Sequence, residues 1–249
     1  MRTAIVTGAS SGIGEEFCRV LDGMGLESIW AVARRAERLE TLAKSLHTPC
    51  RVIPADLSSN DGVDSLMDII ESESPEIVYL VNCAGFGRFG MTSSMERSDI
   101  RGMIALNCTA LSTITSGCIP FMRPGSHIIQ VCSASAYLPL RELNVYSATK
   151  AYVRSFCNGL RRELEGSGIS VLEVSPGWVR TDFIDESMRN ESIPDAVFKH
   201  TVTREAVVRQ TMSDLNKRRS ICGGYNRLQV FICTHFPRLA TIVWERSLR

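Results

Sequence analysis

The hydrophobic pattern of the chain alternates between two kinds of segment. Short apolar or β-branched runs recur at 3–7, 28–33, 51–55, 77–81, 127–131 and 170–174, with longer amphipathic stretches between them. Continuous apolar runs are typical of strands buried on both faces, and such strands separated by helices form parallel sheets. The pattern therefore predicts a doubly wound α/β fold, with a central parallel sheet and helices on both faces.

The amphipathic stretches predict helices over 12–24, 36–46, 60–72, 98–118, 146–165 and about 203–215. No repeat, low-complexity tract or Gly/Ser linker divides the chain, so we expect a single domain over 1–249. Within it, 181–200 has mixed charge and predicts a flap over a substrate. Residues 216–249 form a basic, apolar C-terminal extension of the same domain.

Composition narrows the classes of function. The 249 residues are 44% hydrophobic and carry a formal charge of +1, so no overall cationic field would hold nucleic acid. We find neither a signal peptide nor an uninterrupted apolar run long enough for a membrane span, and expect a cytoplasmic protein. Nine cysteines without a CxxC pair indicate buried free thiols, and four scattered histidines predict no metal site.

The C-terminal extension departs from this charge balance. Seven basic side chains stand against one acidic side chain, Glu245: Lys217, Arg218, Arg219, Arg227, Arg238, Arg246 and Arg249. Apolar runs are interleaved with them. One interpretation is a packed strand and helix with a solvated basic rim; the other is a weak attachment to a membrane surface or to another subunit.

A glycine-rich turn, TGASSGIG, joins the first strand to the first helix at 7–14. Gly8 permits the tight turn, Gly12 lets the backbone approach a pyrophosphate, and Gly14 lets the helix pack closely on the sheet. The positive end of the helix then faces the anion. Strand, glycines and helix together predict a Rossmann fold that binds a dinucleotide.

The residues after the second strand indicate which dinucleotide. Ala33 stands where an acid would hold the ribose hydroxyls of NAD, and Arg34 and Arg35 follow. A guanidinium can grip a 2′-phosphate. We therefore predict NADP(H), with NAD(H) less favoured, held by Arg34 together with Ser10, while Arg35 faces solvent.

These residues, and others in order along the chain, resemble the short-chain dehydrogenase/reductase family. TGASSGIG is similar to its TGxxxGxG turn, NCAG at 82–85 to its NNAG segment, YSATK at 146–150 to its YxxxK signature, and Pro176-Gly177 to its PG segment. The resemblance covers nearly all of the first 182 residues and is closest in kind to NADP-preferring carbonyl reductases and hydroxysteroid dehydrogenases. It implies cofactor contacts from Gly8, Ser10, Ser11, Gly12, Ile13, Gly14, Arg34, Arg35, Asp56, Leu57, Asn82, Ala84, Gly85, Tyr146, Lys150, Pro176, Gly177, Val179 and Thr181.

The chemistry follows from spacing on a helix. Tyr146 and Lys150 are four residues apart and so share one face. An ammonium group beside a phenol should lower the tyrosine pKa towards neutrality, so that Tyr146 exchanges a proton with a substrate oxygen while hydride moves to or from a nicotinamide. Ser133, at the end of the fifth strand, would hold that oxygen. The resemblance adds Asn107, which would hold a water that links Lys150 to solvent.

Pocket walls are expected after the carboxyl ends of the strands. These segments supply mainly apolar side chains: Phe86, Phe89, Ser135, Tyr137, Leu138, Leu140, Trp178, Phe183, Ile184 and Met188. They favour a lipophilic ketone, aldehyde or secondary alcohol, steroid-like molecules included. Alternatives are reduction of a 3-oxoacyl thioester, or a redox sensor that binds NADP(H) without turnover. By resemblance we expect a homodimer or homotetramer.

Overall fold

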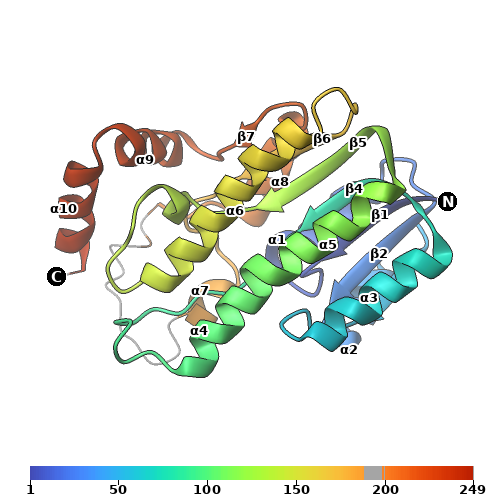
Figure 1. The fold of residues 1–249 in the computed structure, drawn as a ribbon, viewed down its shortest axis with the longest axis horizontal. Helices are drawn as coiled ribbons and strands as arrows, with labels where there is room; N and C mark the ends of the chain where they lie inside the picture. Colours follow the sequence, from blue (N-terminus) through green and yellow to red (C-terminus); the bar gives the residue numbers. More distant parts are fainter. Residues whose placement is uncertain (188–197, 199, 249) are drawn as a thin grey trace.

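The structure, a computed structural model, describes residues 1–187, 198 and 200–248 (Figure 1). Seven parallel strands form one sheet in the order β3-β2-β1-β4-β5-β6-β7. The strands are β1 (Arg2–Thr7), β2 (Ser28–Ala33), β3 (Cys50–Pro54), β4 (Glu76–Asn82), β5 (Met122–Val131), β6 (Ser170–Val174) and β7 (Arg219–Ser220). The order reverses between β1 and β4, where open α/β sheets bind their ligands.

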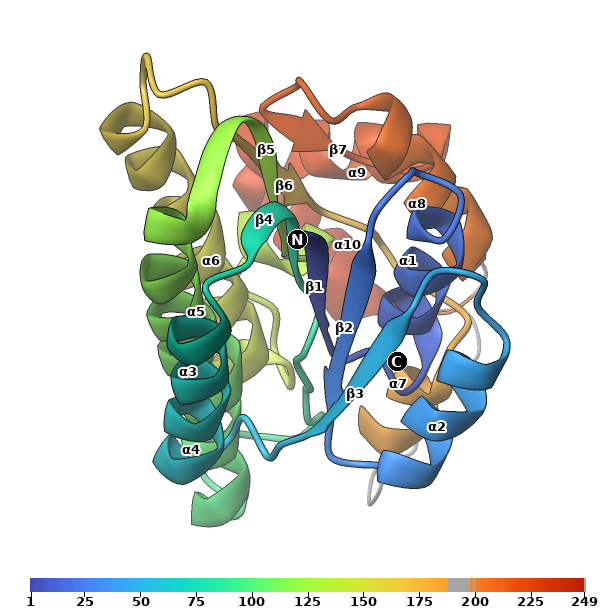
Figure 2. The same cartoon turned by 90° about the vertical axis from the view of Figure 1, so that its right-hand side faces the viewer.

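Helices cover both faces of the sheet, as Figure 2 shows. One layer contains α3 (Asn60–Glu73), α4 (Arg97–Ile104), α5 (Leu111–Cys118) and α6 (Asn144–Glu163); the other contains α1 (Gly12–Leu21), α2 (Ala36–Lys44) and α8 (Arg204–Ser213). The short helix α7 (Asp182–Ser187) follows β6, and α9 (Gly224–His235) and α10 (Pro237–Ser247) end the chain. Single turns are η1 (Ala105–Ala110), η2 (Ile119–Phe121) and η3 (Ala134–Tyr137).

Successive residues of each strand point to opposite faces of the sheet, so their side chains pack into two hydrophobic cores, one on each face. Ile5, Trp30 and Leu80 pack with the α3, α5 and α6 layer, which also takes in buried residues of α9 and α10. Their neighbours Val6 and Ile29 pack with α1, α2 and α8. Burial on both faces explains why the strands read as continuous apolar runs rather than as an alternating pattern.

The six predicted strands and six predicted helices are confirmed, most of them to within a few residues. β5 begins five residues early because a register shift pairs Met122 with Ile77. The helix expected over 98–118 contains a π-helical turn, η1, so three elements replace one. The flap expected over 181–200 falls largely outside the described residues; its described start is α7.

The continuous helical run from Arg97 to Phe121 is long and apolar enough, by length and composition alone, to cross a membrane. Its buried side chains, such as Leu111 and Ile114, belong to the core beneath the sheet. We therefore interpret it as a core helix of the α/β fold. All nine cysteines are free thiols, and six of them are buried.

Candidate active site

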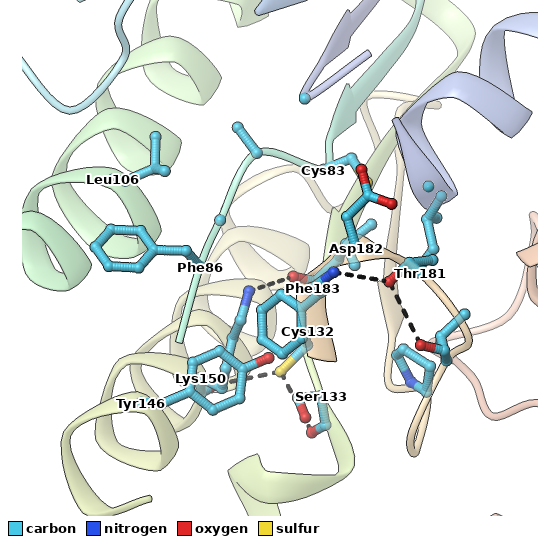
Figure 3. Close-up of a pocket in the computed structure, with 18 of the residues that line it drawn as sticks. Cys83, Phe86, Leu106, Cys132, Ser133, Tyr146, Lys150, Thr181, Asp182 and Phe183 are labelled. Carbon is cyan, nitrogen blue, oxygen red and sulfur yellow. Dashed lines mark hydrogen bonds between the residues drawn. The ribbon is translucent and has the colours of Figure 1, made fainter. Parts of the chain in front are cut away.

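A pocket of about 450 Å³ opens at the carboxyl ends of the central strands. Its walls come from the glycine-rich turn, the residues after β2, β3, β4, β5 and β6, and the start of α6. Figure 3 shows how side chains from these separate elements point into it. The pocket lies at the reversal of strand order, where the fold predicts a ligand.

The backbone after β4 lies so close to the glycine-rich turn that the turn has no room for a side chain at Gly8. Gly8 has a φ of +71°, and a Cβ there would lie 2.8 Å from the Ala84 nitrogen. The Thr7 hydroxyl accepts hydrogen bonds from the backbone nitrogens of Cys83 and Ala84, both at 3.1 Å, which ties the end of β1 to the end of β4. A Cβ on Gly14 would lie 2.3 Å from the Gly8 carbonyl oxygen, so close packing of α1 requires glycine. The roles predicted for Gly8 and Gly14 are structurally consistent, although Gly14 does not line the pocket.

The start of α1 is open towards the pocket. Gly12, with a φ of +60°, begins the helix, and Ser11 before it makes no side-chain capping hydrogen bond. Gly12 and Ile13 line the pocket. The backbone N–H groups of this first turn and the helix dipole therefore suit an anionic group.

Arg35, rather than Arg34, contacts the turn. Its guanidinium donates to the Ser10 hydroxyl at 3.0 and 3.2 Å and to the Ser11 hydroxyl at 2.7 Å, and it lies 3.9 Å from the Asp182 carboxylate. The Ser10 contact expected of Arg34 is thus made by Arg35, whose side chain is still 45% exposed. Which arginine would hold a 2′-phosphate stays a prediction. Both arginines line the pocket and place two positive charges beside the turn.

Asp56 and Leu57 also line the pocket, after β3. One Asp56 carboxylate oxygen accepts hydrogen bonds from the Ser58 nitrogen at 3.0 Å and from its hydroxyl at 2.7 Å. These bonds lower the pKa of Asp56, with a smaller contribution from the positive charge of Arg34. An ionised acceptor thus faces the pocket.

Tyr146 and Lys150 lie one turn apart on α6 and face the pocket (Figure 3). The Lys150 ammonium group lies 5.7 Å from the centre of the Tyr146 ring and donates to the Val131 carbonyl at 2.9 Å. Both residues are almost fully buried, 7% and 4% exposed. Helix α6 therefore brings a phenol and a cation together at the floor of the pocket.

Burial dominates the acidity of both groups. Desolvation raises the pKa of Tyr146, and a hydrogen bond with the Ser133 side chain acts in the opposite direction. Desolvation also lowers the pKa of Lys150. The expected lowering of the Tyr146 pKa by Lys150 is thus not found among the protein's own groups, because the cost of charging a buried phenol is larger.

Ser133 follows β5 in an extended conformation that turns its hydroxyl into the pocket. The hydroxyl accepts from the Ser135 nitrogen at 3.2 Å and from the Ser135 hydroxyl at 3.0 Å. These bonds hold it in place near Tyr146. The predicted triad of Ser133, Tyr146 and Lys150 therefore meets in space.

Asn107 lies behind this triad rather than in the pocket lining. It sits fully buried in the π-helical turn η1, a local widening that often marks functional sites. Its amide nitrogen donates to the Phe86 carbonyl at 2.9 Å and to the Thr149 hydroxyl at 3.0 Å, and its oxygen accepts from the Phe86 nitrogen at 3.1 Å. A Cβ on Gly85 would lie 2.9 Å from that oxygen and 3.4 Å from the Lys150 nitrogen. Asn107 thus positions the segment after β4 beside Lys150.

Most of the other predicted cofactor residues line the pocket, but Asn82 does not. Those that line the pocket are Gly8, Ser10, Ser11, Gly12, Ile13, Ala84, Gly85, Pro176, Gly177, Val179 and Thr181. Asn82 does not: its side-chain nitrogen donates to the Thr115 hydroxyl at 2.9 Å inside the core. Thr181 packs against Gly12, so the segment after β6 closes over the turn.

Five of the predicted substrate-wall residues line the pocket: Phe86, Ser135, Leu140, Trp178 and Phe183. Phe89 lies behind, with its ring stacked on Trp178 at 5.8 Å. Leu138 is core, and Ile184 lies outside the lining. Met188 lies outside the described residues.

Tyr137 points away from the pocket and was wrongly placed there. Its hydroxyl donates to the fully buried Glu173 carboxylate, which also accepts from the Ser175 hydroxyl at 2.7 Å. The guanidinium groups of Arg154 and Arg219 lie 4.3 and 4.8 Å from the Tyr137 ring centre. The Tyr137 hydroxyl thus serves as a hydrogen-bond donor to a buried carboxylate. The apolar residues next to Tyr137 in the sequence give no sign of this role.

Sequence reasoning missed several wall residues that come from distant segments: Arg88, Asp99, Gly102, Leu106, Leu143, Gln229 and Trp244. Arg88 and Asp99 form a partly buried ion pair at 3.3 Å. Trp244 arrives from α10, where its indole nitrogen donates to the Arg141 carbonyl at 3.1 Å. No local pattern marks these residues, although one tryptophan in a basic tail is a feature that could have been pursued.

The fold places this protein in the doubly wound α/β class, with its pocket at the carboxyl ends of the strands. The family model described as short chain dehydrogenase matches residues 2–192, and the chain belongs to that family of oxidoreductases, whose members act on CH–OH and C=O groups.

Individual relatives agree with this assignment. The chain is 31% identical to an uncharacterized oxidoreductase of Staphylococcus haemolyticus over 83% of this chain and 93% of that protein. It is 31% identical to serine 3-dehydrogenase of Agrobacterium fabrum over 79% of this chain and 80% of that protein. Among solved structures, the closed form of serine dehydrogenase complexed with NADP+ has a TM-score of 0.79 and 28% identity, covering 88% and 93% of the two chains.

Proposed function

We propose that this protein is an NADP(H)-dependent oxidoreductase that interconverts a ketone or aldehyde and an alcohol. Tyr146 is the proton donor or acceptor. The observation that carries the proposal is the meeting of Tyr146, Lys150 and Ser133 at the floor of a pocket whose other end is the glycine-rich turn.

The residues present fit a dinucleotide. Gly8 and Gly12 have positive φ values that leave backbone rather than side chain facing the pocket, and the first turn of α1 has no side-chain cap. Asp56 offers an ionised acceptor beyond β3. When bound, a nicotinamide cofactor supplies or accepts the hydride.

We favour NADP(H) because Arg34 and Arg35 line the pocket and Ala33 supplies no competing carboxylate. Arg35 also bridges to Ser10 and Ser11, so its guanidinium is already oriented beside the turn. A relative of known structure carries NADP+, which supports the same choice.

In the reductive direction the chain's groups act on the carbonyl oxygen. Ser133 and Tyr146 donate hydrogen bonds to it, which draws electron density from the carbonyl carbon. As the carbon gains a hydride, the carbonyl π electrons move to the oxygen and the Tyr146 proton joins it. The Lys150 ammonium group lies beside the Tyr146 ring and attracts the negative charge that forms there, although this attraction is smaller than the cost of burying that charge. Oxidation of the alcohol reverses these transfers.

The substrate end favours a lipophilic molecule, because Phe86, Leu140, Trp178 and Phe183 supply most of its wall. The Arg88–Asp99 pair at 3.3 Å supports a second candidate, a small hydroxy acid whose carboxylate would share the Arg88 guanidinium. Serine 3-dehydrogenase among the relatives favours the same class. Acyl thioesters and a non-catalytic sensor are the other outcomes to be tested.

The test is turnover of NADPH, followed by its absorbance, over lipophilic ketones, 3-oxo acids and 3-oxoacyl thioesters. Tyr146→Phe should lower kcat about 10²- to 10⁴-fold while NADPH still binds. Tyr152→Phe is the matched control, since Tyr152 lies on the same helix but is 44% exposed. Equal activity of wild type and Tyr146→Phe would refute the proton donor, and binding without turnover on any carbonyl would identify a sensor.

The pH profile gives a second readout. Because burial raises the pKa of Tyr146, the phenol stays protonated through neutral pH. Reduction, which needs the protonated phenol, should be level through neutral pH and fall only as the pH approaches the raised value. Oxidation, which needs the phenolate, should rise with pH, and Tyr146→Phe should abolish that rise.

We also propose a cytoplasmic homo-oligomer. The resemblance supports pairing through the long helices, and Ile104 and Tyr152 leave apolar surface exposed on that side. Light scattering of the purified chain gives the subunit number, and fractionation of cells gives the location.

A further inference from the structure

The exposed large apolar side chains of the described residues gather at one place. Six of the 12 lie on α9 and α10 and a seventh, Phe236, lies between the two helices, with exposed fractions from 47% to 59%: Tyr225, Leu228, Phe231, Phe236, Leu239, Ile242 and Val243. Figure 1 shows these two helices at one end of the molecule. Single exposed apolar residues are ordinary on soluble proteins, but such a cluster marks an interaction surface.

Helical spacing shows that the cluster is a second face rather than an edge of the core. On α9, Asn226, Val230 and Cys233 are buried, whereas Leu228 and Phe231 are exposed three residues apart. On α10, Ala240 and Trp244 are buried, four residues apart. The exposed large apolar side chains on α10 are Leu239, Ile242 and Val243, at spacings of three and four. Each helix therefore has an inner stripe and an outer stripe.

The two outer stripes are joined. The Phe231 ring lies 4.3 Å from the His235 ring and 6.5 Å from the Phe236 ring, measured between centroids. Pro237 then begins α10 directly. The outer stripes thus form one surface, which we call the α9–α10 face.

The charges around the α9–α10 face are basic. Arg227, Arg238 and Arg246 are exposed on these helices, where Glu245 is the one acidic residue. Within the described part of the chain, none of the three arginines is paired with a carboxylate; Arg227 instead donates to the Ile221 carbonyl at 3.1 Å. An apolar surface rimmed by arginine is complementary to anionic headgroups above an apolar interior.

A second copy of the chain fits this face less well. In a two-fold pair each face would meet itself, so three arginines from each copy would approach one another with only one acidic residue, Glu245, from each copy to neutralise them. Spanning a bilayer is also excluded for these helices: α9 has 12 residues and α10 has 11, against the roughly 20 that a span requires. Lying flat in the interface suits both lengths.

We propose that the α9–α10 face docks on the surface of an anionic lipid bilayer, with its apolar side chains among the headgroups and its arginines on the lipid phosphates. The inner stripe of α10 carries Trp244 to the pocket wall. Docking therefore holds the substrate end of the pocket beside the membrane. Docking requires no turnover, so the binding test is independent of the proposed reaction.

The test is flotation of the intact protein with vesicles of phosphatidylglycerol and phosphatidylcholine, compared with phosphatidylcholine alone. The wild type should float with the anionic vesicles, and its binding should weaken as salt is raised. Phe231→Ser combined with Val243→Ser, and separately Arg238→Gln combined with Arg246→Gln, should each lower vesicle affinity at least about tenfold. Met24→Ser combined with Met91→Ser is the matched control, since these residues are 39% and 46% exposed elsewhere.

Circular dichroism and light scattering accompany each variant. Equal binding to neutral and anionic vesicles, or binding unchanged by both α9–α10 variants in folded protein, overturns the proposal. Absence of flotation also overturns it, and if the Phe231→Ser, Val243→Ser variant then has fewer subunits, the face is an interface between copies. Retained subunit number with lost flotation is the expected result.

Discussion

The two ends of the pocket are built in different ways. The cofactor end consists of the turn, at Gly8 and 10–13, and of residues at the ends of β2 and β3, at 33–35 and 55–58. The substrate end draws on Phe86, Arg88, Leu140, Leu143, Trp178 and Phe183, together with Gln229 and Trp244 from the C-terminal helices. At the first end the backbone sets the shape, and at the second end side chains from distant segments do.

This difference predicts how each end responds to change. At the cofactor end a single added methyl group meets backbone that cannot move, as at Gly8 against Ala84. At the substrate end side chains contact other side chains, such as Phe89 on Trp178, and these can repack. The cofactor end should therefore tolerate few substitutions, whereas substitutions at the substrate end should change the substrate specificity without unfolding the protein.

The largest effect is expected at Gly14. A Cβ there would lie 2.3 Å from the Gly8 carbonyl oxygen, so Gly14→Ala should push α1 from the sheet. We expect a loss of about 2–3 kcal/mol in unfolding free energy and a clear loss of NADPH affinity. Denaturant unfolding and cofactor titration measure the two effects.

Gly159→Ala is the matched control. Gly159 is an exposed residue within α6, and nothing lies within 4 Å of a Cβ there. It should gain about 0.5–1 kcal/mol from helix propensity. If Gly14→Ala were as harmless as Gly159→Ala, the cofactor end would not be held rigid by backbone contact.

A smaller effect is expected at the arginines. Arg35→Ala removes the guanidinium that holds Ser10 and Ser11, and should raise the KM for NADPH about tenfold with little change for NADH. Arg34→Ala tests whether Arg34 also contributes to binding of the 2′-phosphate. Steady-state kinetics of each variant with NADPH and with NADH measure the two contributions. Equal changes for NADPH and NADH in both variants would contradict the assignment of this end to NADP(H).

The same difference explains what could be predicted from sequence. The turn, the strands and the Tyr146–Lys150 pair are local features, since glycines, apolar runs and a four-residue spacing each determine structure within a few residues. The hydrogen bond from Arg35 to Ser10 was not predicted, because it depends on which side chain turns back towards α1. The backbone orientation just before α2 decides which of the two arginines reaches Ser10.

The misplaced and missed residues are non-local. Tyr137 was assigned to the pocket from its position after β5, yet its hydroxyl binds Glu173, 36 residues away. Trp244 reaches the pocket from a helix 103 residues beyond its hydrogen-bond partner Arg141. The raised pKa of Tyr146 likewise depends on burial by the whole fold rather than on Lys150. Such contacts require the packed structure.

The smallest effect is expected at Trp244, which also tests whether the C-terminal helices belong to the substrate end. Trp244→Phe keeps an aromatic ring but removes the hydrogen bond to the Arg141 carbonyl. Loss of one such bond corresponds to about 1 kcal/mol, so the KM for a bulky ketone should change about three- to fivefold while that for NADPH stays constant.

Trp30→Phe is the matched control, because Trp30 is fully buried in the core and does not line the pocket. It should lower the unfolding free energy and leave both KM values unchanged. A change in the NADPH value for Trp244→Phe, without one for the ketone, would show that α10 does not shape the substrate end.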